Sequence, residues 1–484
     1  MTIDEASRRR VENGLRPAVE IAGRPVERHS LVDRMRRYAT PGVSISVVDG
    51  DEIAWTSHHG EAGNGRLVDD STLFQAASIS KAVAAVAMLA LVEAGDLDLD
   101  TDVNSVLRGW RLPDSTHVTD QPVTLRRLLS HTAGTTVPGF PGYPIGTPLP
   151  STIDVLSGRG NTPAVESFAA PGALTQYSGG GSTIVQLLVE ETTGRPFGEV
   201  MRDLVLGPFA MNDSGYEQPI EGSRRTRTAV GHDAAGNPVD GGHHVYPELQ
   251  AAGLWTTSAD LARWVIGVQR ILRGDAKTPI SRATAEAMIA GDGPFGLGPE
   301  ISGEGRHRRF GHSGSNEGFR GQVDALVHAA SGAAILVNGA GGTTLMTEIR
   351  KALADELDWG PIGDPPIVTI EPDPRLLDAL VGRYHGPFGL PLRLETDGTE
   401  IWSPAPYGRR RMLAIAPSRF LDEETGATLV VETSSLANGT HGHHPRVTRI
   451  AVFAGESEIM AFTPESERPP ERPPERSPER PEER

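Results

Sequence analysis

A serine and a lysine stand three residues apart at the start of a long apolar segment of this sequence. Ser78 and Lys81 are followed by a run of alanine, valine, leucine and methionine that continues to Gly95. This composition predicts a buried helix from Ser78 to Gly95, because glycine is the residue that most often follows a helix C-terminus. Residues i and i+3 share one face of a helix, so the hydroxyl and the amine would be neighbours.

Such a pair could make the serine a nucleophile. A charged lysine among apolar side chains is costly, so burial lowers its pKa and favours the neutral amine. A neutral amine beside a hydroxyl is a base next to a nucleophile. The sequence contains only two other lysines, Lys277 and Lys351. The motif alone leaves a second interpretation open, in which Ser78 caps the helix and Lys81 is exposed on its first turn.

The elements around this helix indicate an antiparallel sheet built from distant parts of the chain. The predicted strands are residues 43–48, 53–56, 323–327 and 333–337. Asp49-Gly50 is the turn of the first hairpin, Ser331-Gly332 stands between the last two strands, and residues 345–357 show a helical pattern. Strands at both ends with helices between them predict an α+β fold, an antiparallel sheet flanked by helices, rather than a doubly wound one.

Composition divides the chain into four segments. They are residues 1–360, 361–374, 375–463 and 464–484. The first alternates strand and helix patterns, and the second is rich in proline and predicts a linker. The third has many short strand patterns between Gly, Asn and Asp turns, which favour a small antiparallel barrel or sandwich. The last repeats Pro-Glu-Arg with almost no apolar residue, so we expect it to be disordered.

The overall composition narrows the function classes. The 484 residues carry a net charge of −17, which argues against broad binding to nucleic acid or to anionic membranes. There is no cysteine, so disulfides, thiolate metal sites and a cysteine nucleophile are excluded. The N-terminus is polar and no run of about 18 apolar residues occurs, so we expect neither a secretory signal nor a membrane span. The expected location is the cytoplasm.

Other candidate sites are weaker, and we expect neither a metal nor a cofactor. The histidines of two clusters lie in turn-like segments without matching carboxylates, which predicts solvated loops: they are His441, His443, His444, His243 and His244. No Gly-rich phosphate loop ending in Gly-Lys-Ser/Thr occurs. The segment from Gly311 to Ser315 lacks the last glycine of a Gly-x-Ser-x-Gly elbow. Lys277-Thr278 precedes Pro279, so it is no Lys-Thr-Gly motif.

The Ser-x-x-Lys pair and five further motifs in order resemble those of the serine β-lactamases, penicillin-binding proteins and related esterases and D-aminopeptidases. They are the Ser78-x-x-Lys81 pair with the segments at residues 125–134, 176–181, 207–211, 252–261 and 311–315. The segment at 125–134 resembles the "LLSHTAG" stretch of that family, and the segment at 176–181 resembles its tyrosine motif. Order and spacing match over roughly residues 30 to 355. The resemblance implies a β-lactamase/transpeptidase-like fold with an all-helical subdomain insertion.

The resemblance also implies roles for individual residues. Ser78 would attack a carbonyl and form an acyl-enzyme, and Lys81 and Tyr177 would share the general-base work on its proton. Tyr177 would also act as general acid to the leaving group. His312 stands where many relatives carry the lysine of Lys-Thr-Gly, and would hydrogen-bond Tyr177 or the substrate. The backbone N–H groups of Ser78 and Ser315 would form the oxyanion hole.

Two glycines would shape the substrate site. Gly314 would let substrate approach the strand edge closely. Gly179 occupies the place of an asparagine that in the family commonly contacts the substrate's amide side chain. The overall resemblance is to the class C β-lactamase, esterase and D-aminopeptidase-like branch of the family. Within that branch, Gly179 and His312 fit the esterase and aminopeptidase-like members better than a dedicated β-lactamase. The C-terminal β region resembles, by texture and by Gly382-Arg383-Tyr384, the lipocalin-like domain attached to some of these hydrolases.

The sequence therefore predicts a metal-independent serine hydrolase that acts on an ester or on a small amide or peptide through a Ser78 acyl-enzyme. Two alternatives remain open. One is a cytoplasmic transacylase or peptide cyclase of a natural-product pathway, which passes the acyl group to an amine. The other is an inactive binding or sensor homologue. The expected partner is a small-molecule substrate, with neither nucleic acid nor membrane, and the sequence does not decide between monomer and homo-oligomer.

Overall fold

The chain folds into two compact units. The computed structural model describes residues 4–465 except 119–120, 276–278, 292, 387–390, 406–407, 436–444 and 456. The first unit comprises Met1–Ala18 and Val26–Gly363, and the second comprises Val19–Pro25 and Asp364–Arg484. A short N-terminal segment therefore belongs to the C-terminal unit, which composition did not indicate.

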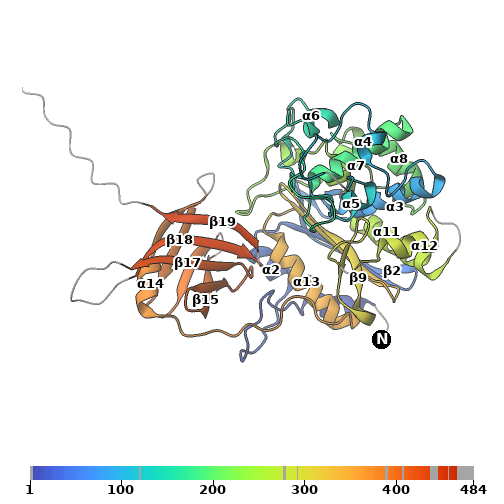
Figure 1. The fold of residues 1–484 in the computed structure, drawn as a ribbon. Coiled ribbons are helices and arrows are strands. Elements are labelled where there is room, and N and C mark those ends of the chain that lie inside the picture. The colour runs from blue at the N-terminus through green and yellow to red at the C-terminus, as the bar shows by residue number, and fades with distance from the viewer. Residues whose placement is uncertain are drawn as a thin grey trace, which may run out of the picture. The chain divides into compact units, whose positions relative to one another are not determined.

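A seven-stranded antiparallel sheet forms the centre of the first unit (Figure 1). Its strands run in the order β3-β2-β1-β11-β10-β9-β8. They are β1 Gly42–Asp49, β2 Glu52–Gly63, β3 Arg66–Leu67, β8 Glu300–Ser302, β9 Arg309–Asn316, β10 Phe319–Leu326 and β11 Ser331–Val337. The pairing of β1 with β11 confirms the prediction of one sheet from distant segments. Ser331 and Gly332 belong to β11 rather than to the turn, because the ladder with β1 extends to Ser331.

Side chains alternate between the two faces of the sheet, as the period of two in a strand requires. Val43, Ile45 and Val47 of β1 pack in one cluster with α1 (Glu5–Glu12), α2 (Leu31–Arg37) and α13 (Gly342–Leu357). Ser44 and Ser46 point the other way, and both hydroxyls hydrogen-bond the Ser258 hydroxyl of α11 (Ser258–Arg273). The sheet is thus covered by helices on both faces.

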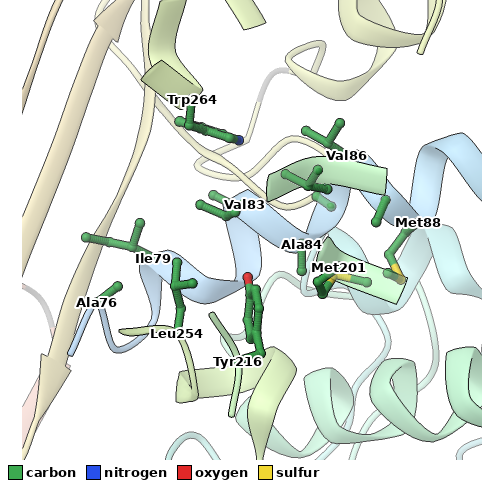
Figure 2. Close-up of a cluster of buried hydrophobic side chains, with 14 of the residues drawn as sticks. Ala76, Ile79, Val83, Ala84, Val86, Met88, Met201, Tyr216, Leu254 and Trp264 are labelled. Atoms are coloured by element: carbon green, nitrogen blue, oxygen red, sulfur yellow. The ribbon is translucent and has the colours of Figure 1, made fainter. Parts of the chain in front are cut away.

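Helix α3, Ile79–Ala94, is the buried helix that the apolar run predicts. It ends at Gly95, whose φ of 83° is the left-handed conformation that glycine adopts without strain. Figure 2 shows Val83 of α3 in one cluster with Trp264 of α11 and Tyr216. Helix α3 packs against β9 and β10, so its first turn is held beside the outer part of the sheet.

Helices α3 to α8 gather on one side of the sheet (Figure 1), and the segment between α3 and α11 forms the helical insertion. Its helices are α4 Val103–Val106, α5 Leu125–Leu129, α6 Thr152–Leu156, α7 Gly179–Thr193, α8 Phe197–Met201, α9 Gly222–Arg225 and α10 Leu249–Ala252. Short helical turns are Arg202–Leu206, Asp240–Gly242 and Gly305–His307, and α12 is Arg282–Met288. Two small strand pairs join β4 Phe74–Gln75 to β7 Trp255–Thr256 and β5 Tyr143–Pro144 to β6 His244–Val245.

The second unit is a closed antiparallel barrel, as expected for the short C-terminal strands. Its strands are β12 Gly382–His385, β13 Pro391–Thr396, β14 Ile401–Ala405, β15 Gly408–Ala416, β16 Arg419–Asp422, β17 Thr428–Ser435, β18 Pro445–Ala454 and β19 Ser457–Pro464. Helix α14, Pro374–Leu380, adds Leu376, Leu377 and Leu380 to the apolar cluster that includes Phe420. Ile21 pairs with Ile367, which ties the N-terminal segment to this unit.

Some expectations fall outside the described residues. They include most of the predicted disordered tail, the cluster His441, His443 and His444, and Lys277-Thr278. Among the helices of the described part of the chain, none has the length and hydropathy that a membrane span needs.

Candidate active site

Ser78 lies at the junction between strand β4 and helix α3. Strand β4 is held by its pairing with β7, where Phe74 lies opposite Thr256. Ala77 then adopts a φ of 50°, a left-handed conformation that costs a residue with a side chain about 1–2 kcal/mol. Such strain is concentrated at functional sites, where the surrounding structure fixes it. The turn puts Ser78 at the N-cap of α3, directly before Ile79, so it stands at the start of the helix as the sequence predicts.

Lys81 is 3% exposed, and its Nζ lies 3.1 Å from Ser78 Oγ. The amine also donates a 2.7 Å hydrogen bond to the Ala251 carbonyl and lies 4.9 Å from the centre of the Tyr177 ring. Burial lowers the pKa of Lys81 to about 7, although the negative charge of Glu300 opposes this shift. The surface interpretation of this lysine is therefore wrong, and about half of the amines are neutral at neutral pH.

Tyr177 precedes α7 and is held by aromatic contacts. Its ring centre is 4.3 Å from that of His131 and 5.7 Å from that of Phe295. His131 has a φ of 56° and accepts a 3.2 Å hydrogen bond at Nδ1 from the Ser178 N–H. Burial raises the pKa of the Tyr177 hydroxyl, and the nearby Ser78 hydroxyl only partly offsets this. The neutral phenol is thus the stable form.

The Tyr177 hydroxyl is a buried donor without an aligned hydrogen-bond acceptor among the described residues. The same holds for Nε2 of His312, whose ring centre lies 6.1 Å from that of Tyr177. His312 is 1% exposed on strand β9, and burial lowers its pKa. Its Nδ1 lies 2.5 Å from the Ser313 carbonyl oxygen and 3.4 Å from Glu300 Oε1.

Beyond its pairing with β8, which ends at Gly311, strand β9 lines the cavity beside Ser78 with the edge that faces away from β10. The Ser313 N–H donates to Glu300 Oε2 at 3.2 Å, so it points away from β10. Ser315 follows two residues later in the same regular ladder, so its N–H points to the same edge. A Cβ on Gly314 would lie 2.2 Å from the Ala76 carbonyl oxygen. Only glycine therefore allows β9 to approach the segment before Ser78 this closely.

A cavity of about 490 Å³ opens onto Ser78 and Tyr177. One wall is the β9 edge, and its charged lining side chains are Glu300, Arg320 and Arg350. Arg350 is neutralised by two hydrogen bonds, of 2.6 and 2.8 Å, to the Asp324 carboxylate. A second cavity, of about 750 Å³, lies between α8 and α9 and is lined by none of the predicted site residues.

The sequence model of the Beta-lactamase family matches residues 28–358. The chain belongs to the Beta-lactamase family. Penicillin-binding protein 4 from Amycolatopsis lactamdurans is 27% identical over 380 residues, which cover 72% of this chain and 94% of that protein. Esterase EstB from Burkholderia gladioli is 32% identical over 199 residues, which cover 38% of this chain and 48% of the esterase.

Solved structures confirm the predicted fold class of this family member. The octameric penicillin-binding protein homologue from Pyrococcus abyssi has a TM-score of 0.58 at 20% identity, and the match covers 89% of this chain and 98% of that one. The chain is a serine hydrolase, as the family match and the esterase relative together indicate. The fold is therefore β-lactamase/transpeptidase-like, as the motifs implied.

Gly179 of this Beta-lactamase family member is a predicted site residue whose surroundings leave no room for a longer side chain. It is buried at the first position of α7, and a Cβ there would lie 2.9 Å from the Phe140 ring. The fold brings Ser78, Lys81 and Tyr177 together, but at Gly179 the Phe140 ring fills the space that a longer side chain would need.

Three side chains of the site were not singled out from the sequence: Glu300, Phe295 and His131. His131 lies inside the quoted 125–134 motif, but only the fold shows its contact with Tyr177. Glu300 belongs to a three-residue strand and reaches the site only through the register of β8 opposite Gly311. The sequence held no signal for that register.

One expectation about histidines was wrong. His243 is buried, with its ring centre 4.9 Å from that of Trp255, and burial lowers its pKa to about 4. The glycines around it suggested a solvated loop, but the segment passes over the core next to β7. No cluster of histidine and carboxylate side chains that could hold a metal occurs among the residues the structure describes.

Proposed function

We propose that Ser78 is the nucleophile of this serine hydrolase and that it forms an acyl-enzyme with an ester or with a small amide or peptide. The observation that carries the proposal is the buried pair itself. Lys81 Nζ lies 3.1 Å from Ser78 Oγ, and burial lowers the pKa of Lys81 to about 7. A base with a pKa near the working pH accepts and returns a proton most effectively.

In acylation, Lys81 takes the proton of Ser78 as Ser78 Oγ attacks the carbonyl carbon. The Ala251 carbonyl, 2.7 Å from Nζ, accepts one N–H of the amine and so helps to turn its lone pair toward Ser78. Tyr177 gives its hydroxyl proton to the leaving group and regains one from Lys81, whose Nζ lies 4.9 Å from its ring centre. Since burial raises the pKa of Tyr177, this residue serves better as a proton donor than as the first base.

The oxyanion of the tetrahedral intermediate would accept hydrogen bonds from the backbone N–H groups of Ser78 and Ser315. Neither group belongs to a flexible side chain, so neither must reorganise when negative charge develops. The Ser78 N–H is at the N-terminus of α3, where the helix dipole also favours negative charge. Gly314 supports this geometry because it lets β9 approach Ala76 closely.

The cavity and the relatives support the proposed substrate class. About 490 Å³ suits a small ligand rather than a folded protein. The relatives include a penicillin-binding protein and an esterase, which supports carbonyl substrates with nitrogen or oxygen leaving groups. Gly179 supplies no amide for substrate recognition, which favours esters and small amides over the peptide recognition that an asparagine there would support.

The test compares Ser78→Ala and Lys81→Arg with the unchanged chain on a p-nitrophenyl ester and on a fluorophosphonate. Both variants should lose turnover, and Ser78→Ala should also lose covalent labelling. Arginine keeps a positive charge but cannot release its proton, so it tests the base role rather than the charge. Ser151→Ala removes a hydroxyl at the N-terminus of α6, away from the cavity, and should keep full activity. Labelling that persists in Ser78→Ala would refute the proposal.

A further inference from the structure

The two ring nitrogens of His312 are in different surroundings. Nδ1 lies 2.5 Å from the Ser313 carbonyl oxygen and 3.4 Å from Glu300 Oε1. Both of these oxygens accept hydrogen bonds, so the hydrogen of a neutral ring must be on Nδ1. Nε2 then carries a lone pair, and it is buried without a hydrogen-bond partner in the described part of the chain.

Glu300 is fixed in this position by strand β9. Ser313 donates to its carboxylate twice, from the backbone N–H at 3.2 Å and from Oγ at 2.8 Å. Within the described residues, His312 is the only basic side chain within 4.0 Å of this carboxylate. The negative charge of Glu300 therefore stays beside Nδ1 and is not consumed by an arginine or a lysine.

The Tyr177 hydroxyl and His312 Nε2 are complementary. One is a donor and the other an acceptor, and both are buried and unpaired on neighbouring rings. Leaving a buried polar group unpaired is destabilising, so a small movement that joins them is favourable. Hydrogen bonds of active sites are often long in the free enzyme and shorten when substrate is bound.

We propose that Glu300 is a positioning residue: together with the Ser313 carbonyl it holds His312 as the Nδ1–H tautomer, and its charge stabilises the protonated ring, so that Nε2 accepts the Tyr177 hydroxyl proton while the acyl-enzyme is hydrolysed. The inference rests on the proposed Ser78 acyl-enzyme and adds a route for the proton in its second half-reaction. It assigns Glu300 a role that neither the motifs nor the family resemblance contains.

The proton count of this step balances. Water attacks the acyl carbon and forms a new C–O bond, its proton moves to the Tyr177 oxygen, and the Tyr177 hydrogen moves to Nε2 of His312. When the intermediate collapses, Nε2 returns its proton to Tyr177, and Tyr177 protonates Ser78 Oγ as the Ser78 ester bond breaks. The products are the free acid and the free serine. No tyrosinate forms, which matters because burial raises the pKa of Tyr177.

Charge decides how readily His312 accepts the proton. Burial and the neighbouring Lys81 lower the pKa of His312, whereas Glu300 raises it. His131 and Tyr177 are the other titratable groups close to the ring, and the pKa of His131 is lowered well below its usual value by burial. The Ser313 carbonyl, through its hydrogen bond with Nδ1, and Glu300 thus stabilise the imidazolium form, and Glu300 supplies the negative charge. Without Glu300 the imidazolium of His312 is less stable, so proton transfer to Nε2 slows and the pKa of His312 falls further.

The experiment separates acylation from deacylation with a p-nitrophenyl ester under rapid mixing. The burst of p-nitrophenol reports acylation, and the steady rate after it reports deacylation. Because Glu300 also raises the pKa of Lys81, the two phases are compared at about pH 9, where Lys81 is neutral with or without Glu300. There Glu300→Gln should keep the burst rate and lower the steady rate roughly tenfold to a hundredfold, the range of a partly lost base. The acyl-enzyme should accumulate in the intact-mass spectrum. The acid limb of the steady rate should move to lower pH, and Glu300→Asp should restore part of the rate.

The matched control is Glu304→Gln, which removes an exposed carboxylate four residues away and should leave both phases unchanged. Equal loss in both phases for Glu300→Gln would indicate a merely structural role and overturn the inference. A Glu300→Gln variant that behaves like Glu304→Gln, with both phases unchanged, would also overturn the inference. A missing Ser78 adduct in the unchanged chain is a different outcome, because it refutes the proposed function itself.

Discussion

The depressed pKa of Lys81 links catalysis to stability, and it can be measured directly. The side chain is buried on α3, and its pKa falls from the ordinary 10.5 to about 7. Between these two pH values the unfolded chain binds one more proton than the folded chain. The free energy of unfolding therefore rises with pH in this window, by about 1.4 kcal/mol per pH unit. The destabilisation caused by burying Lys81 is complete below about pH 7 and disappears above the ordinary pKa that Lys81 has in the unfolded chain.

Lys81→Met removes this titration and keeps the length of the side chain. The loss of the hydrogen bond to the Ala251 carbonyl costs about 1–3 kcal/mol, but this cost does not depend on pH. The stability of the unchanged chain relative to Lys81→Met should therefore increase by about 3 kcal/mol from about pH 6 to about pH 9, which is two full units of titration. Groups away from Lys81 titrate alike in both chains and cancel. The exceptions are His131 and His312, whose pKa values the charge of Lys81 also lowers, so their folded-state titration lies below neutral pH.

The assay is urea unfolding of both chains at the two pH values, with an NMR titration of isotope-labelled lysine as the direct readout. The chain has only the lysines Lys81, Lys277 and Lys351, so three signals are expected. The signal that Lys81→Arg removes should titrate near pH 7, and kcat/KM should fall about tenfold per pH unit below it. A pH-independent stability difference, with a Lys81 signal that stays protonated to about pH 9, would show that burial does not lower the pKa of Lys81.

Three substitutions test the surrounding geometry. Gly314→Ala should cut ester turnover at least a hundredfold, since its Cβ would meet the Ala76 carbonyl at 2.2 Å and push β9 from Ser78; steady-state kinetics with thermal unfolding checks this. Gly179→Asn should lower the free energy of unfolding by about 1–3 kcal/mol because its side chain meets Phe140, and urea unfolding would contradict this by showing no loss. Tyr177→Phe should lower turnover of an amide more than that of a p-nitrophenyl ester, whose leaving group needs no proton; equal losses would argue against a general acid.

The sequence predicts most of the scaffold because local patterns carry it. The apolar run after Ser78 and the glycine at its end define α3, and the hairpin around Asp49-Gly50 appears as β1 and β2. The C-terminal strands close into a barrel as their spacing suggests. The contribution of Val19–Pro25 to the second unit is not predictable, because the pairing of Ile21 with Ile367 joins segments without any local signal.

The residues of the site also fall into two groups, one that the sequence predicts and one that it does not. Four predicted site residues belong to motifs with fixed spacing, so the sequence predicts that their side chains lie close together, and the geometry is compatible with this prediction. They are Ser78, Lys81, Tyr177 and His312. Glu300 belongs to no motif, and its place beside Nδ1 of His312 depends on the register of β8 against β9. The direction of the pKa shift of Lys81 follows from its apolar neighbours in sequence, but the Ala251 carbonyl as its partner requires α10 in three dimensions.

Intact-mass analysis with peptide mapping detects the acylation of Ser78 directly. The chain is mixed with a panel of p-nitrophenyl esters, a penicillin and a fluorophosphonate, and the modified residue is located by fragmentation. One adduct per chain should form, it should map to Ser78, and it should be absent in Ser78→Ala. An adduct on another residue, or an ester that is turned over by Ser78→Ala, would contradict the account.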